Sequence, residues 1–276
     1  MKLGIAAAFP HKSPEEWALL HKNEGLGAVV FPCAADAPQK TIDAYKKAAD
    51  DAGLRIAEVG CWSNPMSPDP VKRKDALAYC IRQTELAEYV GAACCVNISG
   101  AVGDVWDGSY PENYAEETYE RIVLSVQTIL DAVRPKRTAY TLEPMPHMLP
   151  DSPESYLQLI RDIDRPGFGA HIDLVNMITS PRIFYENREL ADRSFTLLGP
   201  YIRSCHLKDA KLAHSLTVSI SETVCGDGGV DLAYYMRRAD ECAPDLPMIL
   251  EHLPTTESYH SSAAYILSLY QGKQNP

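Results

Sequence analysis

The segment "RSCHLKD" (203–209) places a histidine, a lysine and an aspartate at the end of a short apolar run. Seven more runs of similar length occur along the chain, separated by amphipathic, helix-like stretches. The eight runs are "LGIAAA" (3–8), "LGAVVF" (26–31), "RIAEVG" (55–60), "AACCVNI" (92–98), "TAYTLE" (138–143), "FGAHID" (168–173), "YIRSCH" (201–206) and "PMILEH" (247–252). Strand and helix repeated eight times predict parallel strands with right-handed crossovers that close into a barrel. We therefore expect an α/β fold, a single (β/α)8 barrel that spans 1–276 as one domain; a doubly wound open sheet is the alternative.

The stretches between the runs carry helix start and stop signals. In "SPEEWALLHKNEG" (13–25), Ser13 is a candidate N-cap, Pro14 occupies the first helical position and Gly25 follows the end. Five further stretches have a similar pattern: 69–91, 114–133, 152–166, 231–244 and 258–272. These signals support the alternation of strands and helices.

The composition limits the possible partners. The net charge is −11 and no long run of lysine and arginine occurs, which argues against nucleic acid and anionic membranes as partners. There is no apolar run long enough to cross a bilayer, and the apolar stretch of "MKLGIAAAFP" (1–10) is short for a signal peptide. The eight cysteines lack CxxC spacing and two are adjacent, which is typical of small buried residues rather than of disulfides. We expect a cytoplasmic protein.

Four of the runs carry, at the last position or next to it, a polar residue that can bind metal: Glu143, Asp173, His206 and Glu251. In a parallel barrel the carboxyl ends of the strands meet on one face, and that face carries the active site. Side chains alternate along a strand, so the residues two and four positions before these four point to the same side as they do. Those residues are mostly small, whereas the residues on the other side are bulkier. The small set is Thr141, Ala139, His171, Gly169, Ser204, Ile202 and Ile249, and the bulky set is Tyr140, Leu142, Ile172, Met248 and Leu250. We expect the four polar residues to converge inside the barrel mouth.

Each of these residues alone has an ordinary structural explanation. A glutamate at a strand end is commonly a helix cap or a solvated loop residue, and a histidine there is commonly scaffold. Together, three carboxylates would repel one another unless a cation lay between them. The oxygen-rich set with one imidazole suits one divalent ion, with Mn²⁺ expected and Mg²⁺, Co²⁺ or Zn²⁺ as alternatives.

With "HLKD" (206–209), "GDGGVD" (226–231) and "LEH" (250–252) added, the whole chain resembles the xylose-isomerase-like TIM barrels, the sugar phosphate isomerase/epimerase superfamily. The resemblance implies that Glu143, Asp173, His206 and Glu251 hold the metal. It also implies that Glu143 and Glu251 move protons through a metal-bound cis-enediolate, as in a sugar isomerase or epimerase. The expected partner is a small carbohydrate, and the chain is expected to form a homo-oligomer, a dimer or tetramer.

The chain departs from the epimerases of that superfamily at two substrate-binding positions. Asn176 stands where they have a histidine, and "DAKLAH" (209–214) contains no arginine; Asn176 and either Lys208 or Lys211 are the candidate replacements. These departures leave a lyase open as the alternative, either an inosose-type dehydratase or β-elimination of an oxidised glycoside. A non-catalytic sugar-binding protein would not need both glutamates.

A DNA-repair endonuclease of the same fold, resembling the AP endonucleases, is the remote alternative. That branch needs extra histidines after strands two to four and after the strand-six aspartate. The corresponding segments read "FPCAAD" (31–36), "GCWSNP" (60–65), "NISG" (97–100) and "DLVN" (173–176), without histidine.

Further candidates follow from position alone. Trp62 and Trp106 lie on loops over the expected mouth, where they would stack on a sugar ring or plug the barrel. Asn97 ends a strand, and His147 lies on the loop after Glu143. Asp209 is expected either to orient His206 or to pair with Lys208, and to hold the loop after the seventh run in register while Lys208 faces the substrate oxygens. His252 is expected to point away from the metal. The glycines of "GDGG" (226–229) are a candidate phosphate cradle, and 99–111 is a candidate lid.

Overall fold

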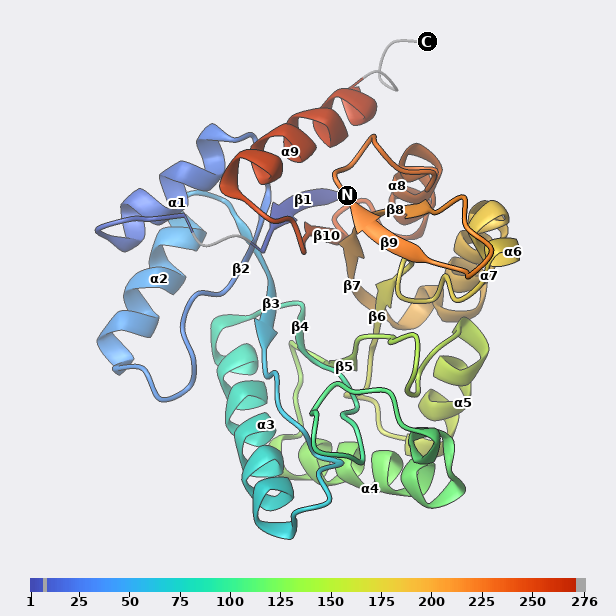
Figure 1. The fold of residues 1–276 in the computed structure, drawn as a ribbon. Coiled ribbons are helices and arrows are strands. Elements are labelled where there is room, and N and C mark those ends of the chain that lie inside the picture. The colour runs from blue at the N-terminus through green and yellow to red at the C-terminus, as the bar shows by residue number, and fades with distance from the viewer. Residues whose placement is uncertain (7–8, 272–276) are drawn as a thin grey trace.

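Eight parallel strands form the centre of the molecule (Figure 1). The computed structural model describes residues 1–6 and 9–271. The strands are β1 (Lys2–Ile5), β2 (Ala28–Val30), β3 (Arg55–Gly60), β4 (Cys94–Asn97), β5 (Tyr140–Leu142), β6 (Ala170–Asp173), β7 (Ile202–Leu207) and β10 (Pro247–Leu250). Each predicted run overlaps one of them, so the eight predicted strands are confirmed, with β1 beginning one residue before its run and β7 ending one residue after; residues 7 and 8 of the first run lie outside the described residues.

The strands are hydrogen-bonded into two four-stranded parallel sheets, in the orders β1-β10-β7-β6 and β2-β3-β4-β5. Backbone hydrogen bonds join the sheets at both seams. At the β1–β2 seam the N–H of Gly27 donates to the carbonyl oxygen of Leu3 at 2.9 Å. At the β5–β6 seam Tyr140 donates to Gly167 and accepts from Gly169, both at 2.9 Å. The predicted α/β barrel is confirmed; that residues 1–276 form one domain stays a prediction.

Helices surround the strands as an outer ring (Figure 1). They are α1 (Pro14–Asn23), α2 (Gln39–Asp51), α3 (Pro70–Val90), α4 (Glu116–Val133), α5 (Pro153–Ile163), α6 (Pro181–Tyr185), α7 (Asn187–Leu198), α8 (Leu232–Cys242) and α9 (Thr256–Gln271), with short 3-10 turns at Pro111–Tyr114 and Gly199–Tyr201. Ser13 caps α1 as predicted, since its side chain accepts the N–H of Glu16. The sequence analysis did not identify α2, α6 or α7. None of the described helices is long and apolar enough to span a membrane.

The predicted alternation of small and bulky residues along the strands separates two apolar layers. Ile249 packs with Ala28 and Ala57 in a small cluster inside the barrel. Residues of the opposite parity, such as Leu142 and Met248, belong to the main core that includes residues of the helices. The polar residues that end the strands therefore lie on the inner side, at the open carboxyl end.

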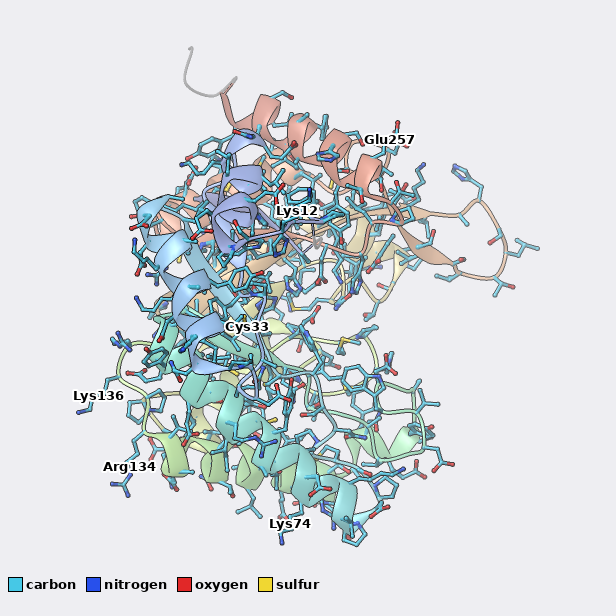
Figure 2. All side chains as sticks on the ribbon, turned by 90° about the vertical axis from the view of Figure 1, so that its left-hand side faces the viewer. Lys12, Cys33, Lys74, Arg134, Lys136 and Glu257 are labelled. Atoms are coloured by element: carbon cyan, nitrogen blue, oxygen red, sulfur yellow. The ribbon has the colours of Figure 1, made fainter. Side chains whose placement is uncertain are left out.

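An antiparallel hairpin follows β7 and was not predicted from the sequence. It consists of β8 (Asp209–Leu212) and β9 (Ile220–Thr223). The hairpin projects from the body of the barrel (Figure 2), and Leu216 between its strands is fully exposed. Its base starts directly after the "HLK" of β7, so the hairpin borders the barrel mouth.

Candidate metal centre

The four polar residues predicted at the strand ends converge at the barrel mouth. Glu143 follows β5, Asp173 ends β6, His206 is the penultimate residue of β7 and Glu251 follows β10. Each offers one ligand atom, and these atoms all lie within 4.8 Å of one another. All four side chains are buried. Three carboxylates and one imidazole so close together form a candidate site for a divalent cation.

The imidazole of His206 points one nitrogen at the three carboxylates. Its Nδ1 lies 2.9 Å from Glu251 Oε1, 3.1 Å from Glu143 Oε1 and 3.5 Å from Asp173 Oδ2. Burial acts to lower the pKa of His206, but the surrounding carboxylates outweigh it and raise this pKa well above its usual value. The Nδ1 atom is therefore the one that faces the candidate site.

Two of the carboxylate oxygens support the fit to a cation. Asp173 Oδ2 and Glu251 Oε1 are buried and have no hydrogen-bond partner among residues 1–6 and 9–271. A buried carboxylate oxygen that accepts no hydrogen bond depends on nearby positive charge, which a bound divalent ion would supply to both. The donor set thus fits one oxygen-loving divalent metal.

The ammonium group of Lys208 lies against the same two oxygens. Its Nζ is 2.8 Å from Asp173 Oδ2 and 2.8 Å from Glu251 Oε1, in directions that do not make hydrogen bonds, and 3.7 Å from Glu143 Oε1. The side chain is only 4% exposed, so it supplies a buried positive charge to the cluster. Lys208 is therefore brought into the site, as predicted.

The two glutamates differ in how strongly they hold a proton. Burial, helped by the charge of Glu251, raises the pKa of Glu143 to about 7. Burial also acts to raise the pKa of Glu251, but the positive charges of His206 and Lys208 outweigh it and lower this pKa to about 2. The cluster thus pairs a carboxyl group that keeps a proton near neutral pH with one that releases it.

Below the cluster lies a buried polar group that the sequence analysis missed. We call Glu58, His171 and Ser204 the floor; all three are at most 2% exposed. Glu58 Oε2 is 3.4 Å from Nε2 of His206, and Glu58 Oε1 is 3.5 Å from Nδ1 of His171. The Ser204 hydroxyl is 2.7 Å from the same His171 nitrogen. One feature of the sequence could have indicated Glu58: it is a carboxylate within a short apolar run, and a strand inside a barrel is buried on both faces.

Above the cluster lies a second polar group, which we call the rim: Lys208, Asn176, Glu222 and His252. The Lys208 ammonium is 3.2 Å from Asn176 Oδ1, from Glu222 Oε1 and from His252 Nδ1. The expectation that His252 points away is wrong, because its Nε2 also lies 3.6 Å from Glu251 Oε1. Glu222 was missed because it belongs to the unpredicted hairpin.

Asn176 joins the rim to the cluster. Its amide nitrogen donates to Glu143 Oε1 at 3.0 Å and to the carbonyl oxygen of Pro144 at 3.1 Å. Its backbone N–H donates to Asp173 Oδ1 at 2.9 Å. Asn176 is thus brought to the site, as predicted, where it holds two of the candidate ligands.

A cavity of about 370 Å³ opens over the cluster. Its lining includes Glu58, Trp62, Trp106, Glu143, His206 and Glu251. Trp62 and Trp106 are 45% and 39% exposed, so both indoles present surface to this space rather than sealing it. The cavity has the size and the mixture of aromatic and polar walls of a small-molecule site.

Two predicted site residues support loops instead of lining the cavity. Asn97 is fully buried, and its side-chain amide both accepts from and donates to the backbone of Ser63 at 3.2 Å. His147 Nε2 donates to the carbonyl oxygen of Asp107 at 2.8 Å, which ties the loop after β5 to the 99–111 segment. For both, the backbone neighbours supply the hydrogen bonds that a ligand would otherwise make.

Asp209 does not reach His206 or the ligand cluster. Its Oδ1 accepts the N–H groups of Ala210 at 2.8 Å and Val230 at 3.1 Å, and its Oδ2 accepts those of Gly226 and Gly228, both at 3.0 Å. A side chain at Gly228 would collide, because its Cβ would lie 2.1 Å from Asp209 Oδ1. Asp209 therefore anchors the glycine-rich turn, and both roles expected for it, orienting His206 and pairing with Lys208, are corrected.

The same contacts rule out the turn as a free phosphate cradle. The N–H groups of Gly226 and Gly228 point at Asp209, and that of Gly229 donates to the carbonyl oxygen of Ala210 at 2.9 Å. Lys211, the other candidate cation, lies on the hairpin and is exposed, 3.9 Å from Asp227. Of Lys208 and Lys211, Lys208 is therefore the one that contacts the candidate ligands.

Comparison with known proteins agrees with this geometry. Residues 20–269 match the family described as xylose isomerase-like TIM barrel. The chain is similar in structure to a D-psicose 3-epimerase with D-tagatose from Clostridium cellulolyticum, at 14% identity and a TM-score of 0.73 over 98% of both chains. It is also similar to a xylose isomerase-like TIM barrel protein from Mycobacterium smegmatis in complex with magnesium, at 18% identity and a TM-score of 0.67 over 94% of this chain and 89% of that one.

Endonuclease IV from Thermus thermophilus has the same fold, at 13% identity and a TM-score of 0.74 over 99% of this chain and 100% of that one. No curated protein sequence matches the chain significantly. Identities this low show a shared fold and leave the activity to be argued from the site. The match over most of the chain shows that this protein belongs to the xylose isomerase-like TIM barrel family.

Proposed function

We propose that this protein is a divalent-metal-dependent isomerase or epimerase of a sugar or sugar derivative. The observation that carries the proposal is the pair of buried glutamates, Glu143 and Glu251, that flank Asp173 and His206 under an open cavity. Two carboxylates on either side of one reacting carbon can remove and return a proton. When bound by these four residues, a divalent ion would act as a Lewis acid toward a carbonyl or hydroxyl oxygen.

The residues of the chain divide the remaining work. One glutamate takes the proton from the carbon beside the carbonyl, and the electron pair moves to the carbonyl oxygen to give a cis-enediolate. The other glutamate delivers a proton to the opposite face of the same carbon in an epimerase, or to the neighbouring carbon in an isomerase. In the isomerase the proton of the adjacent hydroxyl also moves to the former carbonyl oxygen, so that the new carbonyl forms on the first carbon. Because one glutamate removes a proton and the other returns one, the product carries the same charge as the substrate.

The cavity supports a carbohydrate substrate. The exposed indoles of Trp62 and Trp106 offer faces on which a sugar ring can stack. Lys208 and Asn176 stand beside the cluster, in place of the arginine and histidine expected for an epimerase; Lys208 donates to Asn176 and Asn176 to Glu143, and a substrate oxygen would bind them by displacing these contacts.

A repair endonuclease is disfavoured by the ligands at hand. The second set of metal-binding side chains in the described ranges, Glu58, His171 and His206, lies under the first cluster and shares His206 with it. The strand-end segments that would supply further histidines contain none. With a net charge of −11, the chain also lacks the electrostatic attraction to nucleic acid.

Deuterium exchange tests the proposal and separates it from the lyase alternative. The protein would be incubated in D₂O with Mn²⁺ and a panel of ketoses, inososes and 3-oxo-glycosides. We expect deuterium to enter a substrate carbon without loss of water or aglycone. Elimination from one of these compounds would instead identify a lyase, and the absence of exchange across the panel would contradict proton transfer.

Three further points stay predictions. Mn²⁺ as the preferred metal is checked by competition with Mg²⁺, Co²⁺ and Zn²⁺. The homo-oligomeric state is checked by light scattering, and the cytoplasmic location by cell fractionation.

A further inference from the structure

The imidazole of His206 has different neighbours at its two nitrogens. Nδ1 faces the three carboxylates of the cluster, whereas Nε2 faces the floor, 3.4 Å from Glu58 Oε2. A neutral imidazole carries one N–H, so a hydrogen on Nε2 leaves the lone pair of Nδ1 free to bind an ion. The position of that hydrogen therefore decides whether His206 can serve as a ligand.

Glu58 is placed to hold the hydrogen on Nε2. It lies on β3, is 2% exposed and is paired with the floor side of His206. His171 fixes the ring from another side: its ring centroid is 4.1 Å from that of His206 at an interplanar angle of 71°. Ser204 in turn holds His171 at 2.7 Å. Neither the ring of His206 nor its acceptor can turn without moving the floor.

The floor could instead hold a second cation, since Glu58, His171 and His206 also have ligand atoms within 4.8 Å of one another. Two observations weigh against that occupant. The cavity is lined by Glu58 and His206 but not by His171 or Ser204, so only part of the trio faces the space from which an ion would enter. The facing nitrogen of His171 is already bonded to Ser204.

We propose that Glu58 is a positioning residue that fixes the tautomer and the ring orientation of His206, so that Nδ1 points at the bound ion. Histidines that bind metals commonly donate their other N–H to a carboxylate, and losing that partner typically costs about 10–100-fold in metal affinity. The inference rests on the proposed function, because it requires that an ion binds at the cluster.

The first test measures Mn²⁺ affinity by calorimetry in Glu58→Gln and Glu58→Met. The amide of Gln keeps an acceptor oxygen but lacks the charge, and Met lacks both. We expect affinity to fall about 10–100-fold, with the larger loss in Glu58→Met. Thr141→Val is the matched control, because Thr141 is equally buried in the barrel and its hydroxyl donates to the carbonyl oxygen of Cys95 at 3.4 Å. The control should bind Mn²⁺ like the wild type.

The second test reads the tautomer directly and needs no variant of Glu58. In Zn²⁺-loaded wild-type protein with ¹⁵N-labelled histidine, we expect the His206 hydrogen on Nε2 and protected from exchange with water. The resonance is assigned by its absence in His206→Ala. In Glu58→Gln that hydrogen should exchange faster. A wild-type hydrogen on Nδ1 would overturn the inference even if the Glu58 variants did not fold.

The outcomes separate the inference from the proposed function. If the wild type binds Mn²⁺ and Glu58→Gln binds it equally well, Glu58 has no positioning role and the proposed function stands. If the wild type binds two ions per chain and Glu58→Gln binds one, the floor is a metal site and the inference is wrong. If the wild type binds no divalent ion, the proposed function fails and the inference fails with it.

Discussion

The floor and the rim surround the same four ligands but differ in how their charges are held. The floor is the more deeply buried of the two: Glu58 and His171 are at most 2% exposed, and of these two only Glu58 lines the cavity. The rim is partly open to solvent, and its central charge, Lys208, has three polar partners in addition to the cluster carboxylates. Buried groups with few partners hold one geometry, whereas a cation with several alternative partners can move among them.

This difference indicates a division of labour. A rigid floor keeps His206 oriented toward an ion, while the rim offers the carboxylates a replaceable positive charge. Because Lys208 lies 2.8 Å from two candidate ligands, an ion and the ammonium compete for the same oxygens. Changes to the floor and to the rim should therefore shift metal affinity in opposite directions.

Removing one of the four metal ligands, which lie between the floor and the rim, should have the largest effect on metal binding. We expect His206→Ala and Asp173→Ala to lose metal binding and with it nearly all activity, because each contributes a ligand to the cluster. Metal content per chain after dialysis measures this. Lys211→Ala on the hairpin is the control and should retain the metal. Full occupancy in either ligand variant would show that the site lies elsewhere.

Removing only the proton-transfer function should have the next largest effect. In Glu143→Gln and Glu251→Gln an amide oxygen still faces the ion, but an amide cannot accept the proton. Turnover of the substrate found in the D₂O panel should fall by ~10²–10⁴-fold, with part of the metal retained. A variant with a wild-type rate would exclude that glutamate from proton transfer.

Lys208→Met removes the central charge of the rim and should change metal affinity in the direction opposite to a change in the floor. Without the ammonium, Asp173 and Glu251 keep only the charge of His206 in the metal-free protein, and losing one partner of a buried ion pair should destabilise it by about 3–5 kcal/mol. Mn²⁺ then meets no competitor, so we expect its affinity to rise at least about tenfold, equivalent to 1.4 kcal/mol. By linkage, Mn²⁺ should raise the melting temperature of this variant more than that of the wild type.

The exposed Lys211→Met is the control for Lys208→Met and should leave both melting temperatures unchanged. Equal stabilisation of wild type and Lys208→Met by Mn²⁺ would contradict competition at the rim.

The smallest expected effect at the site is that of Asp209→Asn. The amide retains one acceptor oxygen and points a donor at the backbone N–H groups of the turn, which should cost about 1–3 kcal/mol of stability. Since Asp209 contacts neither His206 nor the other ligands, Mn²⁺ affinity should stay within about twofold. A lower melting temperature with unchanged affinity is the expected result; a large loss of metal binding would return Asp209 to the site.

The strand-end ligands could be predicted from the sequence because their geometry is local. Glu143, Asp173, His206 and Glu251 each lie at or next to the end of a run, and the period of two along a strand places them on one side. The same argument also predicted that Trp62 and Trp106 would border the mouth. It required only that the runs form one parallel barrel.

The floor and the hairpin could not be predicted, because their contacts join distant positions. Glu58 meets His206 across 148 positions of the chain, and nothing near Glu58 in the sequence indicates which histidine it faces. Asp209 has two charged or imidazole neighbours close by in sequence, yet three of the four backbone N–H groups that it accepts lie 17 to 21 residues further on. A buried carboxylate pairs with whatever donors the folded backbone brings to it, and sequence proximity does not identify them.

Asp209 acts as an intramolecular ligand of the glycine-rich turn: its carboxylate lies where a separate anion would otherwise bind. The backbone N–H groups of three alternate residues, Gly226, Gly228 and Val230, point at one place that would suit an anion, but a carboxylate of the same chain already fills it. Because this carboxylate belongs to the same chain, its effective concentration at the turn is high and does not fall on dilution. A phosphorylated sugar would therefore gain no anchor from this loop, and the order of the loop would not depend on whether substrate is bound.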